Sequence, residues 1–547
     1  MNSTHIIGTL PDHGGPVRIS PTDVRSRKNR CPRHWATKAR PATPRPYRSA
    51  APSRTLTTWA SGPLHDVLDL VEFSGLSVED ALTKWRSAPG RPFHPALGRW
   101  TEHAVHGYLS ACATIPTPPG VPSGEPPAPV SRLWARQRGP SKPGDPQVYE
   151  EMVTDRRYAG QGVRELRIVR TGSVHDRPRD EAEIAVAAGV LAGGSPVLSS
   201  RWSKSPFRLG AYEPARLVRL VEIGCVDASH RVLFEGTPDE AYALYDSAVE
   251  ARIAEVITDG SYRPGQDCGR CPTVAECPAV PSRPGLLGIS GSELPRRSWS
   301  MTTGRAHRSC PARAHMADLF LPRENSSEDT AATVRGRAVH AWIESRHRRV
   351  PPQACTPDDT PGRPDAWQYE GLAVSGFEAR LGLQMIGDHS LVCPLRGPSD
   401  DIEVHPEQPV VVYDPDADVV VIAKTDLLYR SADRWTVRET KTARTAGEAD
   451  PLERHPQLAL AVLLARAQVL PGAGRFRVEL ERLTASGSVM SELDVTAADV
   501  ATRAQRVLET YVAPWHTDTR YPTRAGEACA DCPFTRWCPD AVERTGA

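Results

Sequence analysis

The chain has 547 residues, more than one ordinary hydrophobic core accommodates, so we expect two or more domains. Hydrophobic residues make up 39% and charged residues 24%, which is typical of soluble globular proteins and excludes a wholly disordered chain. The sequence has no apolar run long enough to span a membrane, and its start lacks the apolar segment of a signal peptide. We therefore predict a cytoplasmic protein without a membrane partner.

The first 55 residues are strongly basic, although the net charge of the whole chain is only +1. They carry eleven Lys or Arg residues against Asp12 and Asp23, so this segment is a candidate for phosphate contact. For residues 1–25 we favour the alternative, a disordered, basic and Pro-rich tail. Lysine is scarce in the chain, with seven lysines against sixty arginines, so each lysine that is present is informative.

Six of the twelve cysteines form two copies of one spacing, C-x2-C-x5-C followed by proline. The first copy consists of Cys268, Cys271 and Cys277, and the second of Cys529, Cys532 and Cys538. A further cysteine followed by proline lies far upstream of each copy, Cys31 for the first and Cys310 for the second. Four thiolates suit either zinc or an iron-sulfur cluster, and the spacing alone does not separate these metals. The remaining cysteines follow no pattern and are predicted to be ordinary buried thiols: Cys112, Cys225, Cys355 and Cys393.

The two halves of the chain show the same order of predicted elements after a glutamate-bearing strand. In the first half these are a helix at 181–192, a strand at 215–224 and a long helix at 239–257. In the second half they are a helix at 455–467, a strand at 476–485 and a long helix at 496–512. We predict an α/β protein with two tandem domains, 26–280 and 299–547, each a small mixed sheet flanked by helices, joined by a Pro/Gly/Ser-rich linker at 281–298.

The segment from 419 to 443 contains two runs rich in β-branched residues on either side of Ser431-Ala432-Asp433, which predicts a hairpin. Asp426 lies on the first strand and Glu439 on the second, so the hairpin can place two carboxylates side by side. Such hard oxygen ligands suit Mg²⁺ or Mn²⁺. Lys441 follows Glu439 by two residues and shares its face of the strand. A divalent cation and a positive side chain are what the hydrolysis of a phosphodiester requires.

At these residues the second half resembles the RecB-type branch of the PD-(D/E)XK nuclease superfamily, including iron-sulfur members related to AddB and to the CRISPR adaptation nucleases. The resemblance covers about 230 residues. It implies a restriction-endonuclease-like fold in which Asp426, Glu439 and Lys441 are catalytic. It further implies that His340, in the run RGRAVHAWIE, and the backbone carbonyl of Thr440 are metal ligands, with Gln457 as a helical catalytic residue.

The resemblance also implies a four-iron four-sulfur cluster on Cys310, Cys529, Cys532 and Cys538. By the same order we predict a second cluster on Cys31, Cys268, Cys271 and Cys277, with zinc as the alternative at both places. The chain departs from the family pattern at Ala461, where the family usually has tyrosine, and at Ala423, where it often has glycine.

The first half departs further. Its run Arg164-Glu165-Leu166-Arg167 has arginine where the second half has Lys441, and Met152 stands thirteen residues before Glu165. His103 and His106 are the candidate histidines of this half, and neither fits the spacing well. We therefore predict a degenerate first domain that keeps its cysteine group and serves in DNA binding or as a scaffold.

We predict a metal-dependent deoxyribonuclease, exo- or endonucleolytic, that acts on single-stranded DNA or duplex ends in DNA repair or anti-phage defence. The chain has no GxxxxGK[ST] loop for ATP, so a helicase or other ATPase subunit is a candidate partner. The alternative is a catalytically silent iron-sulfur subunit of a helicase-nuclease complex that binds nucleic acid without cutting it.

Overall fold

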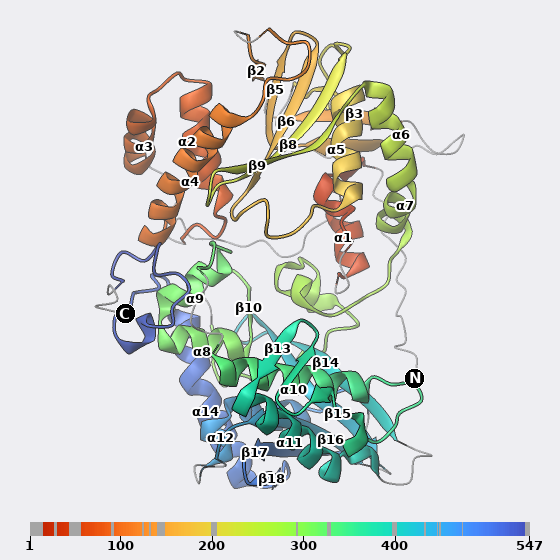
Figure 1. Ribbon diagram of the computed structural model, residues 1–547, viewed down its shortest axis with the longest axis vertical. Helices are drawn as coiled ribbons and strands as arrows, with labels where there is room; N and C mark the ends of the chain where they lie inside the picture. The colour runs from red at the N-terminus through yellow and green to blue at the C-terminus, as the bar shows by residue number, and fades with distance from the viewer. Residues whose placement is uncertain are drawn as a thin grey trace.

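The structure is a computed structural model, and it describes residues 15–26, 30–42, 56–88, 92–122, 125–130, 133–138, 148–198, 205–291, 294–324, 330–396, 402–431, 434–445, 447, 450–472 and 474–541. Figure 1 shows an α/β molecule in which helices flank mixed sheets, with most of the first half above the second. This agrees with the predicted fold class.

The helices of the first half are α1 (Pro32–Lys38), α2 (Ser61–Glu72), α3 (Val78–Ser87), α4 (Pro95–Thr114), α5 (Glu181–Gly193), α6 (Pro238–Ala248) and α7 (Glu250–Thr258). Its strands are β1 (Val17–Ile19), β2 (Ala128–Pro129), β3 (Trp134–Arg138), β4 (Tyr149–Val153), β5 (Arg156–Gly160), β6 (Val163–Arg170), β7 (Ser195–Pro196), β8 (Leu217–Gly224) and β9 (Ser229–Gly236). The predicted helix at 239–257 is therefore divided at Val249.

The helices of the second half are α8 (Met301–Ser309), α9 (Pro311–Asp318), α10 (Ala331–His347), α11 (Gly376–Val392), α12 (Pro451–Arg454), α13 (Pro456–Arg466) and α14 (Ala498–Thr517). Its strands are β10 (Arg297–Trp299), β11 (Gly362–Arg363), β12 (Ala366–Tyr369), β13 (Leu372–Ser375), β14 (Glu403–Asp414), β15 (Val419–Ser431), β16 (Arg434–Thr442), β17 (Arg475–Thr484) and β18 (Gly487–Leu493).

The main sheet of the second half is organised around β15, which shares one of its edges between two strands. β10 pairs in parallel with the start of this edge, at residues 419–421, and β16 pairs antiparallel with its end, at residues 427–431. Beyond that point β16 leaves β15 and continues beside β17 as far as Thr442. We call the opening at residues 422–426, between β10 and β16, the strand fork.

The main sheet of the first half repeats this order of pairing. β5 and β6 are antiparallel, β6 and β8 are parallel, and β8 and β9 are antiparallel, as are the pairs among β15, β16, β17 and β18. Each hairpin closes through two residues, between Gly160 and Val163 in the first half and between Ser431 and Arg434 in the second. Where the second half has the single long β15, the first has β4 and β5 with a break at Thr154 and Asp155.

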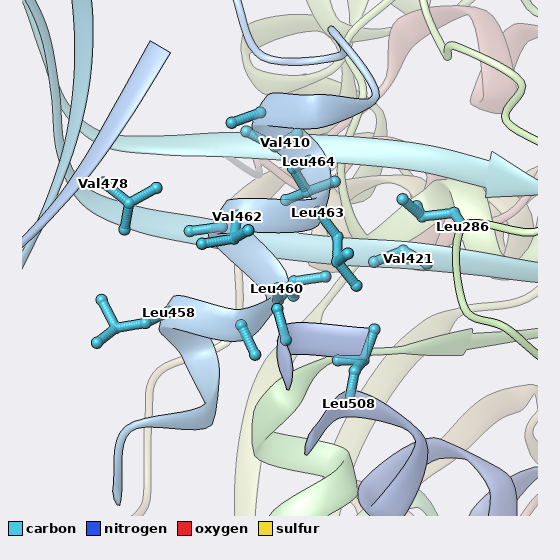
Figure 2. Close-up of a cluster of buried hydrophobic side chains, with 14 of the residues drawn as sticks. Leu286, Val410, Val421, Leu458, Leu460, Val462, Leu463, Leu464, Val478 and Leu508 are labelled. Carbon is cyan, nitrogen blue, oxygen red and sulfur yellow. The ribbon is translucent and has the colours of Figure 1, made fainter. Parts of the chain in front are cut away.

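Helix α13 is apolar on all sides because it lies inside the second half rather than on its surface. Figure 2 shows Leu460, Val462 and Leu464 of this helix among side chains of the sheet and of α14, including Val478 and Leu508. All five side chains are buried. Packing of this core fixes α13, and with it the first turn that carries Gln457, against the sheet.

The cysteine segments cross between the halves. The first triplet packs on the sheet of the second half, in a cluster of Cys268, Val274, Val280, Val411, Tyr413 and Val420. The last residues of the second triplet pack on the helices of the first half, in a cluster that includes Phe534, Trp537 and Cys538 together with Leu64, Leu97 and Trp100. Each half therefore supplies part of the core of the other.

The segment expected to be a linker, 281–298, lies against the second sheet instead. Leu287 is fully buried, and the carboxylate of Asp414 accepts the backbone N–H groups of Gly285 and Leu287. Burial of leucine and strand pairing outweigh the loop-forming composition of this stretch. In the expected tail at 1–25, Val17–Ile19 form the buried strand β1 beside β4, while residues 1–14 lie outside the described part of the chain.

Among the helices that the structure describes, none combines the length and the apolar character needed to cross a membrane.

We expect the substitution Leu464→Ala to lower the free energy of unfolding by about 2–5 kcal/mol, because Leu464 is only 1% exposed and alanine would leave a cavity. The matched control is Leu391→Ala, since Leu391 lies on α11 with 63% of its surface exposed and its loss should change stability by at most about 0.5 kcal/mol. Urea unfolding followed by circular dichroism measures both. Equal losses in the two variants would contradict the assignment of α13 to the core.

Candidate functional site

Asp426, Glu439 and Lys441 come together at the strand fork. Asp426 is one residue beyond the last ladder pair of β15 and β16, Leu427 with Arg438, and so stands across from Glu439. The ammonium group of Lys441 forms an ion pair with Glu439, and its Nζ lies 3.7 Å from Oδ2 of Asp426. The three side chains that the sequence singled out thus form one centre.

Hydrogen bonds hold each carboxylate of this centre in place. The backbone N–H of Thr440 donates to Oδ2 of Asp426 at 2.9 Å, across the gap that opens where β16 leaves β15. Nε2 of Gln457 donates to Oε1 of Glu439 at 3.0 Å. Arg305 of α8 donates in turn to Oε1 of Gln457 at 2.6 Å, which fixes the amide with its N–H toward Glu439.

The electrostatics of the centre favour a cation. Burial and the neighbouring charge of Asp426 raise the pKa of Glu439, although Lys441 and Gln457 act in the opposite direction. Two neighbouring carboxylates repel each other when both are ionised, and a positive charge between or beside them offsets this repulsion. A divalent cation bound to Glu439 would displace the proton that this raised pKa favours.

His340 lies beside these carboxylates on α10. Burial lowers its pKa, with Asp426 opposing the shift and Lys441 adding to it, which favours the neutral imidazole that metal binding requires. Helix α10 approaches β16 closely at Gly336, where a Cβ atom would come within 2.7 Å of Oγ1 of Thr442. The glycine of the run RGRAVH therefore allows the helix to bring His340 to the sheet.

An open cleft of about 770 Å³ adjoins the centre. His340, Gly336 and Thr442 line it, together with the cationic side chains of Arg337 and Arg444. The two carboxylates and the lysine are not among the lining residues, so the cleft leads to the centre from the side of α10 rather than enclosing it.

These residues fit a divalent cation by their chemistry, since they offer two carboxylates and an imidazole. Asp426, Glu439 and His340 would hold it, with the carbonyl of Thr440, which already faces Nζ of Lys441 at 3.1 Å, as a further ligand. When bound, such an ion lowers the pKa of a water and polarises a phosphoryl oxygen. Lys441 would lie beside the phosphoryl oxygens, and Gln457 would orient Glu439.

Sequence reasoning missed two residues of the centre, Arg305 and Glu481. Glu481 lies on β17, is fully buried, and accepts a hydrogen bond from Oγ1 of Thr440 at 3.2 Å. The sequence does not single out Glu481, because β17 (Arg475–Thr484) reads RFRVELERLT and Glu481 is one of its five charged residues. The link between Arg305 and Gln457 has no sequence signal either, because it joins residues 152 positions apart.

Both predicted four-cysteine groups assemble. An enclosed cavity of about 20 Å³ is lined by all members of the first group, Cys31, Cys268, Cys271 and Cys277. Burial, together with the neighbouring thiols, raises the pKa of Cys268 to about 12. In the second group, burial and the nearby Cys310 and Cys529 raise the pKa of Cys532. Four neighbouring thiols are a donor set used by zinc and by iron-sulfur clusters, and binding either one would release their protons.

Two cysteines do not behave as the sequence suggested. Cys355 and Cys393, predicted to be ordinary buried thiols, are buried but lie together with His347 and His389 in a group compatible with a metal ion. Their burial was predicted and their grouping was not, because the chain brings the two histidines from separate helices. Cys225 is fully buried without such a group among the described residues.

The pairing of the first half gives a different alignment from the one that sequence spacing suggested. Asp155 lies five residues before the hairpin end at Gly160, as Asp426 does before Ser431. Met152, expected to face Glu165, lies instead on β4 in another sheet, and Tyr158 is the residue opposite Glu165. The thirteen-residue spacing misaligned the two halves because Glu165 lies two residues after the first paired residue of its strand, Val163, whereas Glu439 lies five residues after Arg434.

By the same count from the turn, Ile168 takes the place of Glu439 and Arg170 the place of Lys441. Glu165 is held in a structural ion network, at 2.6 Å from Arg167 and 3.2 Å from Arg219. At these two described positions of β6, the first half therefore has neither the second carboxylate nor the lysine of the centre.

The histidine of the first half is neither of the expected ones. His65 of α2 lies near Asp155: burial lowers its pKa and the carboxylate opposes that shift, as between His340 and Asp426. His103 bonds to the carbonyl of Val226 at 2.8 Å, and His106 is exposed.

Comparison with known proteins agrees with this geometry in the second half. Residues 298–539, fewer than half of the chain, match the family model of the PD-(D/E)XK nuclease superfamily. The matched region contains the strand fork, α10, α13 and the second cysteine group.

A search of curated proteins found no match. Among solved structures, the one titled "Crystal structure of SSO0001" is 17% identical, with a TM-score of 0.17, and the match covers 25% of this chain and 62% of that one. The chain thus spans less than two thirds of that protein, and so low a TM-score carries no argument about the fold.

We expect the affinity of the centre for Mn²⁺ to rise with pH, because the ion must displace the proton that the raised pKa of Glu439 retains. Where Glu439 is protonated, Kd should fall about tenfold for each unit of pH. In the metal-free protein the sign is opposite: a carboxyl whose pKa is raised by folding makes the fold less stable as the pH rises above its ordinary value of 4.5.

Titration calorimetry from mildly acidic to neutral pH measures this dependence, with Glu439→Gln as the control that has no proton to displace. A Kd that is tight and independent of pH in the wild type would contradict the assignment of Glu439 as a ligand.

Proposed function

We propose that residues 299–547 form a metal-dependent deoxyribonuclease of the RecB-type branch, which hydrolyses phosphodiester bonds with Mg²⁺ or Mn²⁺. The observation that carries this proposal is the meeting of Asp426, Glu439 and Lys441 at the strand fork, with His340 beside them. The match of residues 298–539 to the nuclease family model supports it.

The roles of the residues follow from their contacts. Asp426 and Glu439 bind the metal, while the hydrogen bonds from Thr440 and Gln457 limit their motion. Lys441 is placed to stabilise the charge that develops on the phosphoryl oxygens. It forms an ion pair with Glu439, and its Nζ lies 3.7 Å from Oδ2 of Asp426.

DNA is the substrate that the surroundings favour. The cleft beside His340 is open and is lined by Arg335, Arg337 and Arg444 as well as by Glu344 and Glu407, and guanidinium groups suit phosphate oxygens. Contacts of this kind read the backbone rather than the bases, so we expect binding that is largely independent of sequence and weakens with salt.

We further propose that both four-cysteine groups hold four-iron four-sulfur clusters. Each group is placed where the chain leaves one half and packs on the other, so a cluster there would fasten the two halves together. The order of one early and three late cysteines, as in the iron-sulfur members of the RecB-type branch, supports iron over zinc.

The first half, within residues 26–280, is proposed to be a silent copy of the nuclease domain. It repeats the pairing order of the second sheet and keeps Asp155 and His65. Ile168 cannot bind a cation, and Arg170, at the position of Lys441, is paired with Glu222. This half therefore serves as a scaffold and a surface for DNA.

We expect Asp426→Ala to abolish cleavage of end-labelled DNA and Lys441→Ala to reduce it at least about 100-fold, because each removes charge from the centre. The matched control is Asp155→Ala, which changes the corresponding residue of the first half and should leave the rate unchanged. Metal-dependent cleavage that survives in Asp426→Ala, or that disappears in Asp155→Ala, would contradict the division into an active and a silent half.

Anaerobically purified protein is expected to be brown and to contain four iron atoms per cluster, the number that a cubane requires. Cys529→Ser should remove about half of the iron, because one of two clusters loses a ligand, and should lower the thermal midpoint of unfolding. Cys112→Ser, which changes a thiol outside both groups, should keep the full iron content. Colourless protein that contains only zinc would refute the cluster assignment.

A further inference from the structure

Four buried side chains converge away from the nuclease centre, and none belongs to either four-cysteine group. They are His347 at the end of α10, Cys355 in the following loop, His389 near the end of α11 and Cys393 just after it. Their exposed fractions are between 0% and 4%, and their nitrogen and sulfur atoms all lie within 4.8 Å of one another. Two thiols and two imidazoles make a ligand set of the kind that binds zinc.

The distances within this group match those between the ligands of one ion. With zinc at about 2.0–2.1 Å from nitrogen and about 2.3 Å from sulfur, a tetrahedron has edges of about 3.3 Å between two nitrogens and about 3.6 Å between nitrogen and sulfur. Nε2 of His389 lies 3.4 Å from Nε2 of His347, and Sγ of Cys393 lies 3.6 Å from Nε2 of His347. The side chains are thus already spaced as the corners of such a tetrahedron.

The groups around these ligands orient them toward a common centre. Nδ1 of His389 bonds to Oε1 of Glu481 at 2.8 Å, so the ring presents Nε2 to His347 and the two sulfurs. A carboxylate behind the far nitrogen of a histidine is the usual support of a zinc ligand. The backbone N–H of Cys355 points at Sγ of Cys393 at 3.4 Å, which would stabilise a thiolate there.

We propose that His347, Cys355, His389 and Cys393 bind a structural Zn²⁺ ion. Two thiolates balance the charge of the ion, which makes the complex neutral and suits its complete burial. All four positions are filled by the protein, so the site has no place for substrate and its role is to hold α10 to α11.

This site also supports the nuclease centre, a statement that rests on the proposed function. His340 lies seven residues before His347, on the same face of α10, so fixing the end of this helix fixes the proposed metal-ligating histidine. A second link runs through Glu481, which bonds both to His389 and to Thr440, the residue whose backbone N–H holds Asp426.

The test begins with the wild-type full chain, purified under reducing conditions and washed with EDTA to remove loosely held metal. Zinc content by mass spectrometry and zinc K-edge X-ray absorption are then measured. We expect at least one zinc per chain with imidazole as well as sulfur in its first shell, a signature that the four-cysteine groups are unable to give. Absence of zinc, zinc with sulfur ligands alone, or a disulfide between Cys355 and Cys393 would overturn the proposal.

The variant Cys355→Ala with Cys393→Ala should lose this zinc and its imidazole signal while keeping the iron content and colour of the wild type. Cys225→Ala, the removal of an equally buried thiol outside any such group among the described residues, is the matched control and should keep the zinc. If the double variant fails to fold, the wild-type spectrum still decides the matter.

Cleavage by the double variant should fall about 10- to 100-fold, the range expected when the support of a metal ligand is lost. The two proposals fail separately. Zinc with imidazole ligands in a protein that does not cut DNA would refute the nuclease and leave the zinc site standing, whereas a zinc-free wild type that cuts DNA would refute the zinc site alone.

Discussion

One edge of β15 pairs with two different strands, β10 and β16, and the placement of Asp426, Glu439 and Lys441 depends on this arrangement. A strand in the middle of a sheet normally pairs along both edges, which leaves its backbone groups no freedom. Here β10 and β16 each take one end of the edge, and the residues between them are free of ladder pairing on that side. The opening lets the N–H of Thr440 turn to a side chain, and it gives Asp426 and Glu439 a common space within the sheet.

Around this opening, each charged group is restrained by another element of the second half. Helix α13 supplies Gln457, α8 supplies Arg305 behind it, and β17 supplies Glu481 beneath Thr440. Asp426 and Glu439 therefore have hydrogen-bond donors other than Lys441, namely the backbone N–H of Thr440 and the amide of Gln457. The geometry is preorganised from several sides, which is how a site keeps two like charges close together.

Whether a feature of the site could be predicted from the sequence depends on how far apart its residues lie along the chain. The hairpin that holds Asp426, Glu439 and Lys441 is local, and its turn residues and alternating strands could be read directly. The two cysteine triplets could be found because they repeat one spacing. The set of His347 and His389 with two cysteines was not found, since its members come from separate elements and only the four-residue step from His389 to Cys393 hints at a helical ligand pair.

The errors have physical causes too. The match of Glu165 to Glu439 relied on counting residues, but strand faces are set by the distance from the turn, and that count leads to Ile168 instead. The expected linker and part of the expected tail were judged by average composition. A few apolar residues in each, such as Leu287 and Val17, find a sheet to pair with or pack on, and this outweighs their polar neighbours.

The packing of each cysteine segment on the opposite half also constrains the order in which the protein folds during its synthesis. When residues 268–280 leave the ribosome, the strands β14 and β15 on which they pack have not yet been synthesised. The packing of residues 268–280 is therefore completed only after β14 and β15 exist, whereas the main core of the first half consists of residues between Val17 and Val256. The dependence also runs the other way, because α2 and α4 of the first half pack against the second cysteine group.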